Sequence, residues 1–472
     1  GYVDADKQHT TTAALKMIGA NGSELSTMTV KELKARGNST FAHYPKTAYQ
    51  IKLSAASDLL GTGEQVKTWV LLANYGDATM MHDQFFKELA AEMGMDYVAS
   101  TGWVNLYYDG EYRGVYLLTE KNHIGTDAIN ITDLEAAYED ANEGYGENMT
   151  TATGVNRFGQ AIAYTEDLND PADITGGYMI ELNHQMWDEV SGFKTAQGVA
   201  FNVKSPEWLS EDAVRYISEY YQEFENAAYA ADKSGYNAET GLYYYDYVDA
   251  DSLVKMFVLQ ELGLNPDGFV SSLYFYKDVN GKMYVGPIWD QDMTLGTGWT
   301  KYLAPDQNYT YHYLAEALIQ IPDFQERVRN YYAEFAAKVE KMENRIDDKL
   351  DTLTDSAAMN YILWDLIRVG DPQASGHIWN NVNYTDTVRD MKRWITTRMA
   401  TLEKALAGSS YDSGDANMDG VLDAFDAVDI LRYLAGYDND SFSSQYADFN
   451  GDGKVDAFDA VDILRYLAGY RD

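Results

Sequence analysis

The chain has 472 residues, 46% of them hydrophobic, which is too long for one compact core and indicates two or three domains that fold without covalent cross-links. It contains no cysteine, which excludes disulfides and thiolate metal sites. With 74 acidic and 36 basic residues, the net charge of −38 argues against nucleic acid and anionic membranes as partners, because Lys and Arg drive binding to both.

The first part of the chain is typical of β-strands. Turn signals at Asn21-Gly22 and Asp109-Gly110 interrupt segments of alternating polarity, notably 46–53 and 103–120. One helix is expected at 78–94, ending at Gly94. Residues 122–175 are acidic, rich in Asn, Gly and Thr, and weakly periodic, so we expect a long insertion that is mobile or faces a substrate.

Helical periodicity dominates the second part of the chain, at 211–230, 251–262, 324–346 and 388–406. A strand-rich front and a helical rear predict an α+β domain over residues 1–406, with two lobes and a cleft between them. The small polar segment 407–414 is expected to be a linker. No apolar run approaches the ~20 residues that span a bilayer, and the first residues show no leader of the basic-then-apolar kind.

A hairpin is predicted around Asn280-Gly281, which alternating apolar residues flank on both sides. Folding at this turn pairs position 272 with 289 and 271 with 290, so Asp267 arrives beside Asp290 and Asp292. Three carboxylates at one end of a hairpin repel each other unless a cation intervenes, and oxygen ligands favour Mg²⁺. The alternative is that these acidic residues merely cap turns at the strand ends.

The C-terminal segment 415–472 contains a repeat, because "DAFDAVDILRYLAGY" occurs at 423–437 and again at 456–470. At the start of each copy and in the eight residues before it, acidic or amide residues stand at loop positions 1, 3, 5, 9 and 12 with glycine at position 6, which is the spacing of an EF-hand calcium loop. Position 12 is Asp rather than Glu. We expect two calcium sites on which the fold of this segment depends. The predicted ligands are Asp415, Asn417, Asp419, Val421, Asp423 and Asp426 in the first loop, and Asp448, Asn450, Asp452, Lys454, Asp456 and Asp459 in the second.

Over 411–472 the sequence resembles a type I dockerin, whose duplicated F-hand loops carry Asp at position 12. The resemblance implies a small all-α module that binds a cohesin domain of a scaffoldin, and a secreted, extracellular, cellulosome-associated protein. Because both repeats match, it also implies that either one can dock, in two orientations related by a half turn. The positions implied to contact cohesin are Ala424, Phe425, Arg432, Ala457, Phe458 and Arg465.

Over roughly 12–405 the sequence resembles the CotH family of atypical protein kinases, through "LKARGNSTFAHYPKTAYQIKL", "TWVLLANYGDATMMHDQFFKELA", "GGYMIELN", "FNVKSPE", "QELGLNPDG" and "YVGPIWDQDMTLG". This resemblance implies a divergent, two-lobed protein-kinase-like fold that uses ATP and magnesium to phosphorylate serine on a protein. Asp267 matches the family's catalytic Asp and Asp290 its metal-binding Asp. Ser272 stands where the family usually has Asn, and a serine is a weaker magnesium ligand. The predicted magnesium shell comprises Asp290, Asp292, Ser272 and Glu181.

Phosphate-binding cations are expected from the strand-rich lobe, and the candidates are Arg36, Lys46, Lys52 and Lys204. Lys52 is preferred, because its strand presents it on the face opposite Ile51 and Leu53. Glu181 is expected either to complete the metal shell or to pair with Lys52. Four histidines show no ligand spacing and are expected to be turn or surface residues: His43, His82, His123 and His184.

Three functions remain open from these observations. The first is ATP-dependent phosphorylation of a protein hydroxyl, anchored to a scaffoldin through the dockerin. The second is a degenerate kinase fold that serves as a binding or structural module of the cellulosome. The third is a glycosidase with Asp267 and Asp290 as an acid–base pair, which explains neither the hairpin nor the basic strand.

Overall fold

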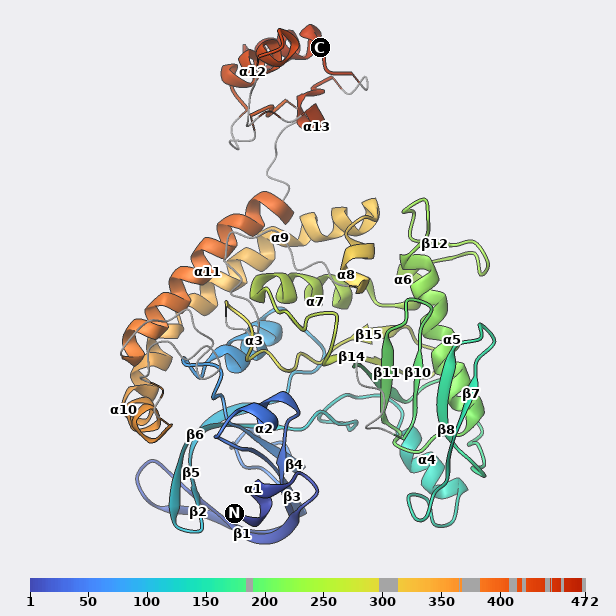
Figure 1. The fold of residues 1–472 in the computed structure, drawn as a ribbon, viewed down its shortest axis with the longest axis vertical. Coiled ribbons are helices and arrows are strands. Elements are labelled where there is room, and N and C mark those ends of the chain that lie inside the picture. The colour runs from blue at the N-terminus through green and yellow to red at the C-terminus, as the bar shows by residue number, and fades with distance from the viewer. Residues whose placement is uncertain are drawn as a thin grey trace.

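The computed structural model describes residues 1–183, 190–296, 313–364, 366, 383–406, 414–417, 422–437, 442, 444–450 and 454–468. Two antiparallel sheets, flanked by helices, form the large domain (Figure 1). This arrangement confirms the expected α+β class. The more detailed expectation of a kinase-like fold with two lobes stays a prediction.

The first sheet has six strands in the order β1-β2-β3-β4-β6-β5. The strands are β1 (Thr10–Ile18), β2 (Glu24–Arg36), β3 (Ala48–Ser57), β4 (Val66–Leu72), β5 (Thr101–Tyr108) and β6 (Glu111–Glu120). The predicted turns lie between β1 and β2 and between β5 and β6. Asp109 and Gly110 have φ of 51° and 79°, the positive values that a two-residue hairpin turn requires at both positions. The short helices α1 (Tyr2–Ala5) and α2 (Ser39–His43) flank this sheet.

The second sheet has seven strands in the order β15-β14-β9-β11-β10-β8-β7. Its strands are β7 (Thr151–Val155), β8 (Ala161–Thr165), β9 (Tyr178–Leu182), β10 (Gly192–Lys194), β11 (Ala200–Ser205), β14 (Leu273–Lys277) and β15 (Met283–Val285). Of this sheet, sequence patterns predicted only the β14–β15 hairpin. The remaining five strands are short, and all of them lie in the chain between α4 (Leu134–Ala141) and α5 (Glu211–Ala228).

The weakly periodic segment 122–175 has more regular structure than expected. It forms α4 (Leu134–Ala141) and the strands β7 and β8, and these strands pair with each other over five positions. β8 also pairs with β10, so the segment extends the second sheet to its edge. The segment thus has regular structure in these elements, and the expectation that it is an insertion that is mobile or faces a substrate stays a prediction.

Helices of the expected length and position cover the sheets, and Ser210 and Asp249 cap two of them through their side chains. The helix expected at 78–94 begins later, at His82, and Gly94 follows its end with φ of 70°. The helices are α3 (His82–Glu92), α5 (Glu211–Ala228), α6 (Tyr244–Tyr247), α7 (Ala250–Gly263), α8 (Tyr313–Leu318), α9 (Pro322–Glu343), α10 (Ile346–Trp364) and α11 (Tyr384–Leu406). A two-stranded ribbon, β12 (Tyr236–Asn237) with β13 (Leu242–Tyr243), completes the domain.

A cluster of buried side chains joins the two sheets. It combines Val70 of β4 with Met179 of β9, Tyr274 of β14 and the ring of Trp289. In each of these strands the neighbouring residues point the other way, into a core of their own. One face of each sheet therefore looks toward the segment that contains Trp289 and Asp290.

The C-terminal segment has a separate small core, formed by α12 (Ala424–Leu434), α13 (Ser444–Ala447) and α14 (Ala457–Leu467). Ile430 and Ile463, at equivalent positions of the two repeats, are both buried there. The expected all-α character thus holds for the described residues. Among these residues, no helix combines the length and apolarity that crossing a membrane requires.

Candidate functional site

The β14–β15 hairpin brings its two ends together, as predicted, although its register differs by one residue. Lys277 pairs with Met283, which leaves a five-residue loop instead of the expected two-residue turn. The side chain of Asp278 explains the wider loop, because it accepts hydrogen bonds from the backbone N–H of Val279 and, at 2.9 Å, of Thr132. The expected pairs 272–289 and 271–290 are therefore wrong.

At the open end of the hairpin, the Ser272 hydroxyl donates a hydrogen bond of 2.9 Å to Oδ2 of Asp290. Both residues have left-handed backbones, with φ of 56° and 61°. Residues other than glycine rarely adopt this conformation, and such strained positions cluster at functional sites. Asp290 is exposed, so its carboxylate is accessible from solvent.

Asp267 lies in the loop that follows α7, where the helix ends in a left-handed residue, Leu264. Its backbone N–H donates to the side chain of Asn265 at 3.0 Å, and its carbonyl accepts from the N–H groups of two following residues. Burial raises the pKa of Asp292 well above its usual range, and nearby carboxylates, among them Asp290 and Asp267, raise it further. The negative charges of Asp267 and Asp290 therefore both raise the pKa of the same carboxyl group, that of Asp292.

Helix α3 contributes two charged residues to this region that sequence reasoning missed. Asp83 and Lys87 are both buried. Oδ1 of Asp83 accepts a hydrogen bond of 3.0 Å from the backbone N–H of Gln291. Burial raises the pKa of Asp83 to about 6 and lowers that of Lys87 to about 8. The only signal in the sequence was the spacing of four residues between an acid and a base on one helix.

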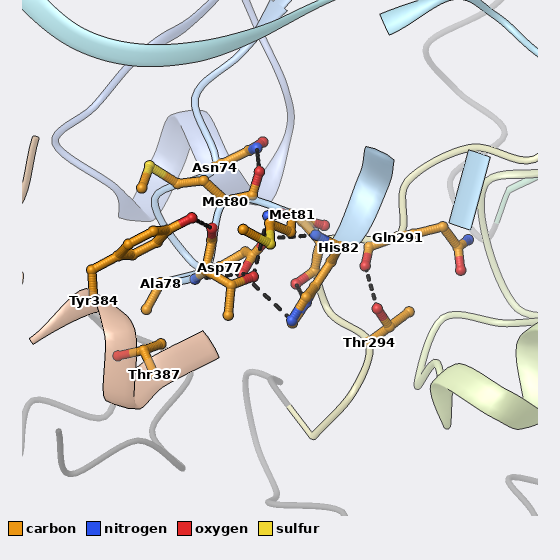
Figure 2. A network of polar contacts seen from close by, with 12 residues as sticks. Asn74, Asp77, Ala78, Met80, Met81, His82, Gln291, Thr294, Tyr384 and Thr387 are labelled. Carbon is orange, nitrogen blue, oxygen red and sulfur yellow. Dashed lines mark hydrogen bonds and ion pairs between the residues drawn. The ribbon is translucent and has the colours of Figure 1, made fainter. Parts of the chain in front are cut away.

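A buried turn precedes α3 and ties it to the segment after Asp290 (Figure 2). The carboxylate of Asp77 accepts from the N–H of Thr79 at 2.8 Å and of His82 at 2.9 Å, and so satisfies the first backbone N–H group of the helix. The His82 ring lies between this carboxylate and the carbonyl oxygen of Asp292, 3.4 Å from Nδ1. The expectation that His82 is a turn or surface residue is wrong, because it is fully buried; His184 lies outside the described residues.

Two of the predicted phosphate-binding cations lie at the site. The guanidinium of Arg36 is 5.5 Å from the centre of the Trp289 ring, which Lys87 also approaches, at 4.6 Å. Lys204 forms an ion pair of 3.4 Å with Glu181, so Glu181 pairs with Lys204 rather than with Lys52.

Tyr274 connects these groups. Burial raises its pKa, the carboxylates of Glu181 and Asp290 raise it further, and Arg36 opposes them. Glu181 pairs with Tyr274 across the sheet.

The other two cations are placed differently. Lys52 is partly exposed on the face of β3 opposite Ile51 and Leu53, as expected. Lys46 is only 1% exposed and donates to the carbonyl of Val115 at 2.5 Å and to the side chain of Asn360 at 3.0 Å. The structure therefore does not bring Lys46 to the carboxylate cluster.

The donor chemistry of the site suits magnesium. Asp267, Asp290 and Asp292 supply carboxylate oxygens and Ser272 a hydroxyl, and the hard Mg²⁺ ion prefers such ligands. The crowding that raises the pKa of Asp292 is the situation that a cation relieves. Within the described ranges, however, no three His, Asp or Glu side chains already have the spacing that a bound metal requires.

In the C-terminal segment, the first calcium loop is closed by its last acidic residue. The buried Asp426 accepts from the N–H of Asn417 at 3.3 Å and of Asp423 at 2.8 Å. Asp415, at the first position, is also buried. Burying carboxylates together is costly unless a cation accompanies them, so the described part of this loop fits calcium. Asp419 and Val421 lie outside the described residues.

The second loop repeats this arrangement. The buried Asp459 accepts from the N–H of Asn450 at 3.2 Å and of Asp456 at 2.8 Å. Asp448 and Lys454 are described at their expected loop positions, whereas Asp452 lies outside the described residues. The agreement between the two loops shows that the repeated sequence gives repeated geometry.

The helices that follow the loops expose the residues expected to bind a partner. Phe425 is 69% exposed and Phe458 70%, although both are large apolar side chains. The remaining four candidates are exposed as well: Ala424, Arg432, Ala457 and Arg465. Exposed apolar side chains that lie together on a helix are typical of a protein-binding surface.

Fold and site together define a two-part protein, in which an α+β domain with a carboxylate-rich site precedes a helical module with paired calcium loops. Residues 33–402 match the family described as CotH kinase protein, and residues 413–468 match the dockerin type I domain. The first match spans well over half of the chain, so the protein belongs to the CotH family and carries a C-terminal type I dockerin. No curated protein matches the chain. A type I dockerin is a cohesin-binding module of the cellulosome type, and it implies calcium binding.

Proposed function

We propose that the CotH domain binds ATP with magnesium and phosphorylates a hydroxyl group of a protein. The observation that carries this proposal is the closure of the hairpin, which brings the Ser272 hydroxyl into hydrogen-bonding contact with Asp290. The charges of Asp267 and Asp290 both raise the pKa of Asp292, so the three carboxylates belong to one cluster. Protein kinases use a comparable layout, with one Asp for the acceptor hydroxyl and another for the metal.

The residues of the site have separate roles in this proposal. Asp267 orients the acceptor hydroxyl and accepts its proton, because it lies in a loop that backbone hydrogen bonds hold in place. Asp290 and Asp292 hold magnesium, with the Ser272 hydroxyl beside Asp290. When bound, the metal neutralises the negative charge of the phosphate oxygens. Glu181 completes the metal shell or orients Lys204.

The cations of the site suit a polyphosphate. Arg36 and Lys204 approach from the two different sheets, and Lys52 points away from the core on the first sheet. In a chain of net charge −38, these cations near the carboxylates supply the local positive charge that phosphate binding requires.

Calorimetric titration of ATP with magnesium tests the proposal. The wild type is expected to bind, and Asp290→Ala is expected to abolish binding because it removes the central metal ligand. Calcium is kept in excess throughout, so that magnesium does not fill the dockerin loops. Absence of binding by the wild type would exclude the nucleotide-dependent function.

A second candidate is a catalytically degenerate domain that acts as a binding or structural module. Ser272 favours it, because the family usually has Asn at this position and a hydroxyl is the weaker magnesium ligand. In the titration above, this candidate predicts no binding of ATP with magnesium, while the dockerin still binds its partner.

For the C-terminal segment we propose calcium-dependent docking onto a cohesin domain of a scaffoldin, through the exposed faces around Phe425 and Phe458. This docking would place the protein outside the cell as a secreted component of the cellulosome. The domain limits that we propose are 1–406 for the CotH domain, 407–414 for the linker and 415–472 for the dockerin.

A further inference from the structure

Helix α3 contacts three of the four consecutive residues from Trp289 to Asp292. The ammonium of Lys87 packs against the ring of Trp289 at 4.6 Å. Oδ1 of Asp83 accepts from the N–H of Gln291 at 3.0 Å, and Nδ1 of His82 lies 3.4 Å from the carbonyl oxygen of Asp292. The contacts come from one helix and reach the residues on both sides of Asp290.

The backbone of this segment needs such support. Asp290 has φ of 61°, a conformation that raises the free energy of a residue with a side chain and persists only where its surroundings enforce it. The bonds to Gln291 and Asp292 fix the peptide groups that follow Asp290. Lys87 and Arg36 fix the aromatic ring that precedes it.

The helix is itself held on its other sides. The buried carboxylate of Asp77 accepts from the N–H of His82, the first residue of the helix. Toward the surface, Glu88 forms an ion pair with Lys349 of α10, and Glu92 forms an ion pair of 2.9 Å with Arg345. A helix anchored in this way transmits little movement to the segment it contacts.

We propose that α3 positions the metal-binding segment, with Asp83 and His82 as positioning residues that hold the carboxylates of Asp290 and Asp292 in place for magnesium. This inference rests on the proposed function of the site. Neither residue needs to touch the metal. The partners that orient metal ligands typically change metal affinity about 10- to 100-fold when they are removed.

The test uses the full chain and measures the affinity for Mn²⁺ in the presence of ATP, by electron paramagnetic resonance of free Mn²⁺. Excess calcium fills the dockerin loops, and Asp290→Ala provides the blank. Asp83→Ala is expected to raise the dissociation constant about 10- to 100-fold. Asp83→Asn, which keeps an acceptor for the Gln291 N–H, is expected to stay within about threefold of the wild type.

Glu88→Gln is the matched control, because it removes a carboxylate from the same helix but breaks only the ion pair with Lys349. It is expected to leave Mn²⁺ affinity unchanged. His82→Phe keeps a ring and removes the nitrogen that faces Asp292, so it tests the second contact and decides the matter if Asp83→Ala does not fold. It too is expected to weaken Mn²⁺ binding.

The outcomes separate the two proposals. If the wild type binds no more Mn²⁺ than Asp290→Ala, the proposed function is wrong and the positioning role falls with it. If the wild type binds but folded Asp83→Ala or His82→Phe binds equally well, the positioning role alone is overturned. Equal losses in Asp83→Ala and Glu88→Gln would also overturn it, because they would indicate general destabilisation of α3.

Discussion

Replacing Lys46 by Met separates the two roles open to this residue, burial in the fold and binding of phosphate. Burial lowers the pKa of Lys46 from its ordinary 10.5 to about 7. Because one pKa unit corresponds to ~1.4 kcal/mol, keeping this ammonium inside the protein costs about 5 kcal/mol at neutral pH. The hydrogen bonds to Val115 and Asn360 offset part of that cost.

The sign of the pH effect follows from proton binding. Between pH 7 and 10.5 the unfolded chain holds a proton on Lys46 that the folded protein has lost, so the contribution of Lys46 to stability rises with pH across this window. Lys46→Met lacks this contribution. The free energy of unfolding of the wild type minus that of the variant should therefore increase by about 2 kcal/mol from pH 7.5 to 9. Other titrating groups are common to both proteins and cancel in the difference.

Urea unfolding followed by tryptophan fluorescence is the suitable assay. All nine tryptophans precede residue 407, so the signal reports the CotH domain and not the dockerin. Near pH 7 the variant is expected to be at least as stable as the wild type, because an apolar side chain of similar length replaces a buried charge. Binding of ATP with magnesium should be unchanged. If the unfolding free energies of the two proteins changed with pH in parallel, the lowered pKa of Lys46 would be refuted. Loss of nucleotide binding in the variant would restore Lys46 as a phosphate ligand.

Three further predictions concern the metal-dependent parts of the protein. Chelation of calcium should reduce the helical circular dichroism of the dockerin, because the buried loop carboxylates lose their counter-charge. Tryptophan fluorescence, which reports the CotH domain, should stay constant. A fall in fluorescence together with the helix signal would contradict this prediction. Replacement of Phe425 or Phe458 alone should weaken cohesin binding little in a pull-down assay, and replacement of both should abolish it; loss from one single variant would exclude two docking modes. Ser272→Asn should tighten binding of ATP with magnesium about tenfold in calorimetry, or ~1.4 kcal/mol. The reason is that Asn tolerates the left-handed backbone and adds an amide oxygen as a metal ligand. Unchanged affinity would remove Ser272 from the metal shell.

Much of the fold was predictable because its signals are short. The Asp109-Gly110 turn, the helices α5, α7, α9 and α11, and the hairpin at Asn280-Gly281 all follow from patterns within a few residues. The register of that hairpin was not predictable, because Asp278 takes part in a bond to Thr132 from a distant segment. Most strands of the second sheet were not predictable from the sequence for a similar reason. Its strands are short, and the β9–β14 pair joins segments that the helices α5, α6 and α7 separate along the chain.

In the candidate site, too, contacts between residues close in the sequence were predictable and contacts between distant segments were not. The meeting of Ser272 and Asp290 required only a local chain reversal. The participation of Asp83 could not be predicted from local sequence, since its partner Gln291 is 208 residues away. The burial of Lys46 depends on Asn360, which is 314 residues away, and nothing in the pattern around Lys46 distinguishes it from an exposed cation.

By itself, the sequence determined the calcium loops, their duplication and the closure of the acidic hairpin, because ligand spacing and turn chemistry act over about a dozen residues. Only the tertiary structure decided which cations and histidines reach the carboxylates and which are enclosed elsewhere. Burial and electrostatic environment arise from all the segments that pack around a group, and those segments are far apart along the chain.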